Sequence, residues 1–492
     1  MVVLGLARQG TALARWLAGQ GAQVTVSDAK PASALGDALR SLEGRSIRFE
    51  LGGHPLSLLD QCDLLCLSGG VPIDLPIVVE AVKRGVPLAN DAQLFVERCP
   101  ATIIGITGSA GKTTTTALVG EMARSAGPLR ATQERTLVWV GGNIGNPLIG
   151  DLNSIAKSDV VVMELSSFQL EIMTSSPPVA AVLNVTPNHL DRHPSMEAYI
   201  AAKARILDFQ SPQDTAVLGY DDPVARSLVS RVRGKVRFFV GDVGDWSRLP
   251  HSLPDSLPHS LPHAVVKYGH VVLVKDGDVP VCALSDIQLR GDHNVLNVLA
   301  ACALADAVGI SPEAMREAII GFRGVAHRLQ RVRELNGVTY YDDSIATAPE
   351  RLVAAIKSFH EPVVLLAGGR DKHLPWAEAA ELIVQRVRQL IVFGEMAELV
   401  ERAVSVSATV PSASLRGSSR VASHNPSHKL QERTLVLEDV HRVESLADAV
   451  KKAAEVARPG DVVLLAPGGT SFDAFKDFAE RGDTFQEYVR AL

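Results

Sequence analysis

The sequence predicts an α/β protein of three domains: a Rossmann-like N-terminal domain, a central domain with a mostly parallel sheet, and a Rossmann-like C-terminal domain. The 492 residues suggest about three domains at roughly 150 residues each. Apolar runs alternate with helical patterns along the chain, as expected for strands joined by crossover helices. Gly-rich turns at residues 5–10 and 107–112 each follow an apolar strand and open a helix, an arrangement typical of such sheets.

The composition is that of an ordinary globular protein. Hydrophobic residues make up 46 % of the chain, charged residues 21 %, and the formal net charge is -6, so no nucleic-acid partner is indicated. No apolar run approaches the ~20 residues of a membrane span, and Arg8 comes too early for a secretory signal. The five cysteines are scattered, which favours free thiols in a reducing compartment over structural zinc. We therefore expect a cytoplasmic, monomeric enzyme.

The first predicted domain, residues 1–98, carries a partial nucleotide-binding pattern. Its strands are expected at residues 2–4, 24–27, 64–67 and near 86, with a helix at 11–18. Gly5-x-Ala7-x-x-Gly10 follows the first strand, and Asp28 closes the second. This approximates a dinucleotide fingerprint with alanine in the second glycine position, so it indicates a phosphate- or nucleotide-bearing ligand without naming it.

The second predicted domain, residues 99–324, contains the strongest motif. An apolar strand at 102–107 leads into Thr107-Gly108-Ser109-Ala110-Gly111-Lys112-Thr113-Thr114, and a helix follows to about residue 125. Backbone N–H groups of such a turn bind phosphates, while Lys112 would reach the β- and γ-phosphates and the Thr113 hydroxyl would ligate Mg²⁺. Ile106 stands where a standard Walker A motif has its first glycine. By itself the motif predicts a phosphate-binding loop that holds a nucleotide.

Three further residues of this domain are candidates for the same chemistry. Glu164 ends an apolar strand at 160–164 and could complete a magnesium shell. His189 follows a strand at 179–185 and could bind a metal, with Asp191 orienting its ring. Lys203 lies in a predicted helix at 198–209; another helix is expected at 294–308. Taken singly, a carboxylate at a strand end is common and a helical lysine is better explained as a solvated residue, whereas a loop histidine is as readily a solvated residue as a ligand.

The third predicted domain, residues 325–492, repeats the doubly wound pattern. Strands are expected at 339–341, 363–367, 390–393, 435–437 and 462–466, with helices at 375–387 and 446–457 among others. Two segments interrupt the alternation: residues 251–262 repeat His/Asp-Ser-Leu-Pro three times, and residues 405–433 carry eight serines without apolar periodicity. Both are predicted to be surface insertions with little fixed structure.

Motifs in a fixed order across nearly the whole chain resemble the Mur ligase family, which builds the stem peptide of bacterial peptidoglycan precursors. They are T-G-S-x-G-K-T-T, G-G-N-I-G-N-P, M-E-L-S-S-F-Q-L-E, N-V-T-x-N-H-L-D-R-H, A-A-K-A-R-I, G-D-H-N-V-x-N, H-R-L and Y-D-D-S-I-A-T. The segment 467–482 looks like that of the members that add D-glutamate. The resemblance implies UDP-substrate-binding, ATP-binding and amino-acid-binding domains. It also implies that the substrates are UDP-N-acetylmuramoyl-L-alanine, D-glutamate and ATP, and that the reaction uses two Mg²⁺ ions and an acyl-phosphate intermediate.

The resemblance also implies roles for individual residues. Phosphate contacts would come from Gly108, Ser109, Ala110, Gly111, Lys112, Thr113 and Thr114. The rest of the ATP would meet Asn294, Arg328 and Asp343. The metal ligands would be Thr113, Glu164, His189 and a carbamylated Lys203, and the catalytic groups Lys112, Lys203 and His189. The UDP-linked substrate would meet Asp28, Ser68, Gly69, Gly70, Asn143 and His189. D-Glutamate would be positioned by Thr347, Lys372, Ser471, Phe472 and Phe478.

The chain departs from the family pattern at several of these positions. Gly69 stands where S-P-G has proline, and Ile345 stands where N-D-S-K-A-T-N has lysine, so this position supplies no lysine contact. Residues 467–471 read P-G-G-T-S in place of P-A-x-A-S.

Three alternatives stay open at this point. Another Mur ligase or a folylpolyglutamate synthase relative would share most motifs, although the D-N-P-R motif of diamino-acid-adding members is missing from the third domain. An NAD-dependent oxidoreductase would explain Gly5, Gly10 and Asp28 but not the loop of Lys112. A P-loop switch or binding protein would leave Lys203, Arg328 and the C-terminal segment without a role.

Overall fold

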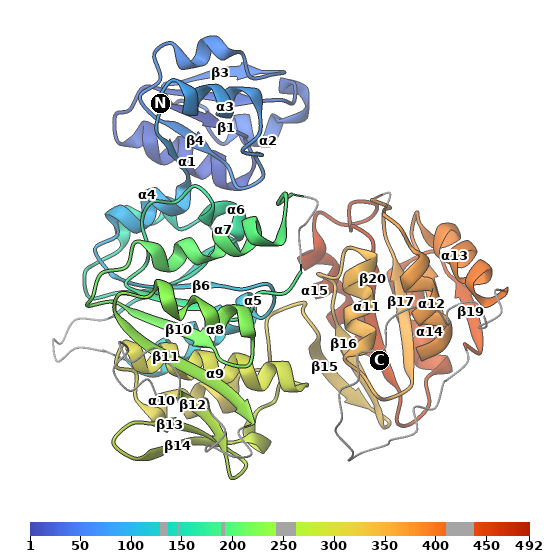
Figure 1. Ribbon diagram of the computed structural model, residues 1–492. Helices are drawn as coiled ribbons and strands as arrows, with labels where there is room; N and C mark the ends of the chain where they lie inside the picture. Colours follow the sequence, from blue (N-terminus) through green and yellow to red (C-terminus); the bar gives the residue numbers. More distant parts are fainter. Residues whose placement is uncertain (128–135, 146, 188–191, 243–261, 373, 410–436) are drawn as a thin grey trace. The chain divides into compact units, whose positions relative to one another are not determined.

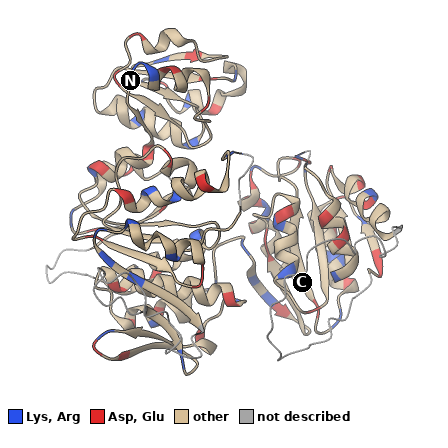
Figure 2. Ribbon diagram, in the orientation of Figure 1, with Lys and Arg blue, Asp and Glu red and all other residues tan. Residues whose placement is uncertain are grey.

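The computed structural model describes residues 1–127, 136–145, 147–187, 192–242, 262–372, 374–409 and 437–492. Its strands form three sheets, and the chain divides into two compact units, Met1–Phe322 with two sheets and Arg323–Leu492 with one (Figure 1). This confirms the predicted three-domain α/β class, while the predicted limits at residues 98 and 324 stay predictions. Lys and Arg are interspersed with Asp and Glu over the described residues, in keeping with the absence of a basic run (Figure 2).

The N-terminal sheet is parallel throughout, in the order β3-β2-β1-β4-β5. The strands are β1 Val2–Leu4, β2 Val24–Asp28, β3 Ile47–Leu51, β4 Leu65–Leu67 and β5 Leu88–Ala89, and the helices α1 Arg8–Gly19, α2 Gly36–Arg40, α3 Pro76–Lys83 and α4 Asp91–Arg98. Because Leu4 pairs with both Ser27 and Leu67, the carboxyl ends of β1, β2 and β4 meet at one edge. That is the edge at which open parallel sheets bind ligands.

The central sheet has nine strands in the order β14-β13-β12-β11-β10-β9-β6-β8-β7, and its neighbours pair in parallel except that β13 runs antiparallel to both β12 and β14. Its strands are β6 Thr102–Thr107, β7 Val138–Gly142, β8 Val160–Glu164, β9 Val179–Val182, β10 Thr215–Gly219, β11 Lys235–Asp242, β12 Pro262–Lys267, β13 His270–Val274 and β14 Asp278–Ala283. Its helices are α5 Lys112–Ser125, α6 Ser167–Leu170, α7 Met196–Asp208, α8 Pro223–Ser227, α9 Asp292–Ala307 and α10 Pro312–Gly321. The phosphate-loop strand β6 is almost wholly buried between β8 and β9.

The C-terminal sheet runs β15-β16-β20-β17-β18-β19, and only the edge strand β15 is antiparallel. Its strands are β15 Gln330–Leu335, β16 Val338–Asp342, β17 Val363–Gly368, β18 Val387–Phe393, β19 Asp439–Arg442 and β20 Val462–Gly468. Its helices are α11 Pro349–Lys357, α12 Ala377–Arg386, α13 Ala397–Thr409, α14 Leu446–Val456 and α15 Phe478–Ala491. The neighbouring strands β16, β20 and β17 end at one edge of the sheet. The residues expected to bind the amino-acid substrate follow these strand ends.

Two expectations need correction. The strand expected at 435–437 is wrong at Leu437, which is not in a strand, and β19 begins at Asp439. Residues 435 and 436 lie outside the described residues. The predicted start of the insertion at residue 405 is too early, because residues 405–409 complete α13. Residues 410–433 lie outside the described part. Residues 251–261 lie outside it too, and Pro262 begins β12.

Two absences concern only the described residues. None of their helices combines the length and the apolar character that a bilayer-spanning helix needs. The five cysteines are free, and no group of three or more His, Cys, Asp or Glu side chains in the described ranges could hold a metal ion.

Candidate functional site

The Gly-rich turn after β1 is held tightly against the end of β2. The Asp28 carboxylate accepts hydrogen bonds from the backbone N–H groups of Leu6 (2.7 Å) and Lys30 (2.8 Å). A Cβ at Gly10 would lie 1.9 Å from the carbonyl oxygen of Gly5, so only glycine allows α1 to start this close to the turn. Asp28 therefore stands beside the first turn, as the pattern predicts.

The turn of Ser68, Gly69 and Gly70 lies beside the same loop. Ser68 donates its backbone N–H to the carbonyl of Leu4 (3.0 Å), and Gly69 donates its N–H to Oε1 of Gln9 (3.2 Å). A proline at position 69 has no N–H and could not make the second bond. Glycine in place of the proline of S-P-G therefore supplies a backbone N–H, and Gln9 accepts its hydrogen bond.

The phosphate loop runs from β6 to α5, and two asparagines brace it. Ala110 donates its N–H to Oδ1 of Asn184 (2.8 Å), and Ser109 donates its N–H to the carbonyl of the same residue (2.9 Å). Gly111 has a left-handed φ of +83°, and a Cβ there would lie 2.2 Å from Oδ1 of Asn297. Both asparagines stand in quoted motifs, but nothing in those motifs indicates that the side chains contact the loop.

Two lysines converge on the start of this loop. The Nζ atoms of Lys112 and Lys203 donate to the carbonyl oxygen of Gly108 at 2.9 and 2.8 Å. Lys203 is only 1 % exposed and lies 4.7 Å from the centre of the Tyr199 ring. The solvated-helix explanation of Lys203 is therefore wrong. Burial holds its pKa well below the usual value and the charge of Lys112 adds to this, whereas Glu164 opposes it.

Glu164 lies at the end of β8, next to the first turn of α5 that contains Thr113 and Thr114. The Thr113 hydroxyl donates to Oε2 of Glu164 (2.9 Å), and Nδ2 of Asn143 donates to Oε1 (2.9 Å). The carboxylate is 2 % exposed. A hydroxyl and a carboxylate at the start of a phosphate-loop helix are hard oxygen donors that fit Mg²⁺. His189 and Asp191, the other candidates, lie outside the described residues.

Asn143 also joins this group to the N-terminal sheet. Its carbonyl accepts a hydrogen bond from Nη2 of Arg8 (3.3 Å), and Arg8 opens α1 directly after the nucleotide-binding turn. One residue therefore connects the edge expected to bind the UDP-linked substrate with the expected magnesium ligand Glu164.

The residues expected to hold the rest of the ATP are divided between the units. Asn294, in the first turn of α9, accepts a hydrogen bond from Asn297 (2.9 Å), the residue that faces Gly111. Asp343 lies in the second unit and accepts the backbone N–H of Leu329 (3.1 Å). Burial raises the pKa of Asp343 to about 7, and the neighbouring Arg328 opposes this rise. A joint role of these residues stays a prediction.

Residues expected to bind D-glutamate gather where β16, β17 and β20 end. Nζ of Lys372 donates to Oγ1 of Thr347 (3.1 Å), and a backbone bridge between Arg370 and Thr470 brings their two loops together. Ser471 is buried, whereas the Phe472 side chain is 60 % exposed and Phe478 is 36 % exposed. The structure thus brings together the loops that carry Thr347, Lys372 and Ser471.

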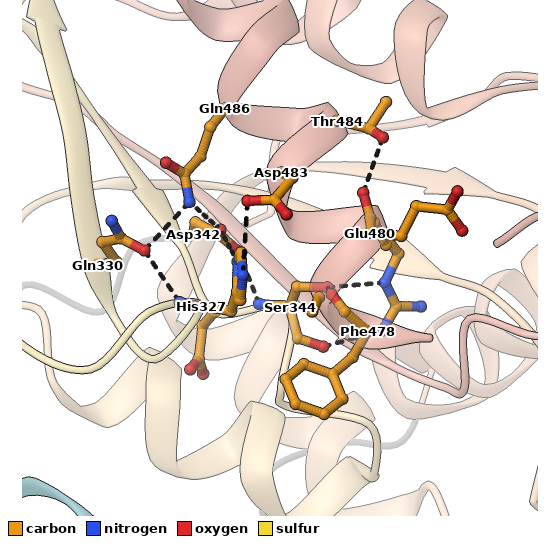
Figure 3. Close-up of polar contacts among 12 residues, drawn as sticks. His327, Gln330, Asp342, Ser344, Phe478, Glu480, Asp483, Thr484 and Gln486 are labelled. Carbon is orange, nitrogen blue, oxygen red and sulfur yellow. Dashed lines mark hydrogen bonds and ion pairs between the residues drawn. The ribbon is translucent and has the colours of Figure 1, made fainter. Parts of the chain in front are cut away.

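A buried pair that the sequence did not assign supports this edge. Nδ1 of His327 lies 2.8 Å from Oδ2 of Asp342, and Nε2 of Gln486 donates to the same oxygen (2.8 Å; Figure 3). A Cβ at Gly482 would lie 2.1 Å from Nδ1 of His327, so this glycine lets α15 approach the pair. The H-R-L motif drew attention only to its arginine, because nothing in the sequence shows that His327 is buried against an acid.

Replacing His327 by glutamine should remove a pH-dependent part of the stability. The pKa of His327 is raised because Asp342 accepts its hydrogen bond, while burial opposes the shift. The ion pair therefore stabilises the fold fully below the unfolded pKa of about 6.5, and this contribution is lost as the pH rises through the higher folded pKa. We expect the thermal midpoint to fall over this window more steeply in the wild type than in His327→Gln.

The measurement is thermal unfolding between about pH 6 and 9. The exposed His360 of the same unit provides a matched control as His360→Gln. Parallel pH dependence in the wild type and His327→Gln would contradict the assignment.

Comparisons with known proteins place the chain in a family. Three family models match consecutive segments: the Mur ligase MurD-like N-terminal domain at residues 1–90, the Mur ligase middle domain at 106–305, and the Mur ligase glutamate ligase domain at 327–469. The chain is 39 % identical over 491 residues to the UDP-N-acetylmuramoylalanine–D-glutamate ligase of Symbiobacterium thermophilum, covering 100 % of this chain and 97 % of that protein. The protein of the same name from Pelotomaculum thermopropionicum is 37 % identical over 494 residues, with the same coverage.

Solved structures share the fold at lower identity. UDP-N-acetylmuramate-alanine ligase MurC from Thermotoga maritima has a TM-score of 0.53 at 19 % identity, covering 100 % of this chain and 99 % of its own. MurF from Acinetobacter baumannii has a TM-score of 0.54 at 15 % identity, covering 100 % and 93 %. The chain belongs to the Mur ligase family. Within it, the chain groups with the UDP-N-acetylmuramoylalanine–D-glutamate ligases.

Proposed function

We propose that this protein joins D-glutamate to UDP-N-acetylmuramoyl-L-alanine and converts ATP to ADP and phosphate, in the cytoplasmic synthesis of peptidoglycan precursors. The observation that carries the reaction type is the convergence of Lys112 and Lys203 on the Gly108 carbonyl, beside the Thr113–Glu164 pair. The identity of the substrates is supported by full-length relatives of that name at 39 and 37 % identity.

The reaction needs an activated carboxylate. The substrate carboxylate attacks the γ-phosphorus of ATP, the bond to the β-phosphate oxygen breaks, and an acyl phosphate and ADP result. The amine of D-glutamate then attacks the acyl carbon, loses a proton and expels phosphate, so that an amide remains. Lys112 would lie against the β- and γ-phosphates and offset the charge that builds on the transferring group.

Magnesium fits the oxygen donors at the start of α5. Thr113 and Glu164 would hold one ion, and His189 with a modified Lys203 would hold the second. When bound, Mg²⁺ neutralises phosphate charge and polarises the transferring group. Asn143 would keep the Glu164 carboxylate oriented, because it already donates a hydrogen bond to one of its oxygens.

Carbamylation of Lys203 would turn a buried cation into a carboxylate-like ligand. The neutral amine adds to the carbon of CO₂ and releases one proton, which leaves a carbamate. Only an unprotonated amine can react in this way, and burial favours that form of Lys203 by lowering its pKa. The proximity of Lys112 favours it too, because a carbamate beside a cation is stabilised by attraction.

The two substrates would be bound by residues of different sheets. Asp28, Ser68, Gly69 and Gly70 would bind the uridine-linked substrate at the edge of the N-terminal sheet. Thr347, Lys372, Ser471, Phe472 and Phe478 would position D-glutamate, and Lys372 supplies a cation for one of its carboxylates.

The test is phosphate release from ATP with each substrate omitted in turn. We expect sustained release only when UDP-N-acetylmuramoyl-L-alanine and D-glutamate are both present. Release that proceeds equally well without D-glutamate would exclude the ligase function, and release that depends on a diamino acid would assign a different acceptor.

A further inference from the structure

Arg481 is a fully buried arginine in the first turns of α15, and the reaction described above gives it no task. Its side chain is 0 % exposed. Burying a guanidinium is costly, and an apolar residue of similar volume often stabilises a protein as well or better. A buried cation that is kept next to an expected binding site for a dicarboxylate therefore calls for a functional explanation.

Every hydrogen bond that the described structure gives Arg481 ends on an uncharged oxygen. Nε donates to Oγ of Ser344 (3.0 Å), and Nη2 donates to the carbonyls of Ser344 (2.9 Å) and Gly469 (3.2 Å). Nη1 donates to the Gly469 carbonyl as well (3.3 Å). No carboxylate in the described part of the chain forms an ion pair with this guanidinium, so its charge is not cancelled by direct contact.

These hydrogen bonds join two of the three loops that carry the expected D-glutamate residues, and the guanidinium lies close to the third. Ser344 lies in the loop after β16, three residues before Thr347. Gly469 lies in the loop after β20, two residues before Ser471. A Cβ at Gly369, in the loop after β17 that leads to Lys372, would lie 3.0 Å from Nη1 of Arg481.

The same network reaches Phe478. The Ser344 hydroxyl, which accepts from Nε of Arg481, donates to the carbonyl of Phe478 (2.7 Å). Figure 3 shows Ser344 beside Phe478. A chain of hydrogen bonds therefore connects the guanidinium, the loop after β16 and the first residue of α15. Such a fixed fork of donors positions backbone more sharply than a flexible ammonium can.

The charge of Arg481 also acts on the expected site. It contributes to lowering the pKa of Lys372, after burial and the charge of Arg351. The nearby carboxylates Asp342 and Asp473 make no hydrogen bond with it, and Asp342 is occupied by His327 and Gln486. The guanidinium thus places a positive charge beside the expected site that attracts an anion, while Asp342 and Asp473 offset part of this charge.

We propose that Arg481 is a positioning residue for the amino-acid substrate: it ties the loops of Thr347 and Ser471 together beside the loop of Lys372, and its buried charge favours an amino acid with a second carboxylate. This rests on the proposed function, because the expected residues define the site. It also explains the E-R-G sequence at 480–482, in which the arginine ties the loops and Gly482 admits His327.

The test separates the two halves of the reaction. Hydroxylamine traps an acyl phosphate as a hydroxamate, so its formation from ATP and UDP-N-acetylmuramoyl-L-alanine reports the first half without any amino acid. The full reaction is measured with D-glutamate and with D-glutamine, which has the same shape but lacks the second carboxylate. The variants are Arg481→Met, which removes the charge, Arg481→Lys, which keeps it without the fork, and the exposed control Arg402→Met.

In Arg481→Met we expect the KM for D-glutamate to rise by about tenfold to a hundredfold, and the preference for D-glutamate over D-glutamine to fall by about tenfold or more. Hydroxamate formation should stay within about threefold of the wild type, because positioning of the acceptor does not enter the first half. Arg481→Lys should raise the KM while keeping most of the preference, and Arg402→Met should change neither.

An unchanged KM and preference in Arg481→Met would overturn the proposal, and so would an equal loss of hydroxamate and amide formation. If Arg481→Met does not fold, Arg481→Lys decides: a raised KM with normal hydroxamate formation supports the proposal, and an unchanged KM overturns it. If the wild-type protein forms no hydroxamate, the proposed function itself fails, which is a distinct result.

Discussion

Replacing Lys112 by alanine should reduce phosphate release in the complete reaction by about a thousandfold or more while leaving the protein folded. Charge develops on the γ-phosphoryl group as it is transferred, and a preorganised cation in a water-excluded site stabilises it strongly. Removal of a single oxyanion donor costs about 10²–10³ in rate in other enzymes, and a full positive charge is expected to cost at least as much.

The fold should tolerate this substitution because Lys112 is only partly buried and its Nζ bonds to carbonyls of its own loop. Thermal unfolding and binding of the UDP-linked substrate should therefore match the wild type. Lys157, an exposed lysine of the same unit, gives the control variant Lys157→Ala, which should retain full activity. A Lys112→Ala rate within about tenfold of the wild type would remove the phosphate assignment.

Elements with strong local signals could be predicted from the sequence almost to the residue. β6 and α5 were placed at 102–107 and from 112 to about 125, because a buried apolar run ends at glycines and a helix with a polar first turn follows. β8 was placed at 160–164 because an apolar run ends there at an acidic residue. By contrast, the strands β10 to β14 were not predicted, because short runs in this region carry no motif that separates them from loops.

The candidate site was predictable in its chemistry but not in its contacts. The residue types of Lys112, Thr113 and Glu164 indicated phosphate and magnesium binding, whereas the burial of Lys203 depends on how α7 packs against the loop. Helical spacing alone does not show which face is covered. The same limit applies to three residues whose partners are distant in the sequence. Asn184 and Asn297 contact residues that lie 74 and 182 positions away, and Arg481 contacts residues of other loops.

Replacing Lys203 by alanine should lower the rate by about a thousandfold, and small carboxylic acids such as acetate should restore part of it. The substitution removes a ligand of the expected second magnesium ion, so transition-state charge stabilisation is lost with it. It also leaves space next to the Gly108 carbonyl and the Tyr199 ring, where Nζ of Lys203 now lies. A carboxylate that enters this space supplies the two oxygens that a carbamate would provide.

The rescue is the decisive measurement, because burial of a plain ammonium would predict the opposite. If Lys203 acted as a cation, methylamine would restore activity and acetate would not. We expect acetate to raise the rate of Lys203→Ala by at least about tenfold, and to leave both the wild type and Lys112→Ala unchanged. Rescue by the amine alone would show that the lysine serves the phosphate loop as a cation, and full activity of Lys203→Ala would show that the lysine is dispensable. In either case the second metal site would need a different ligand.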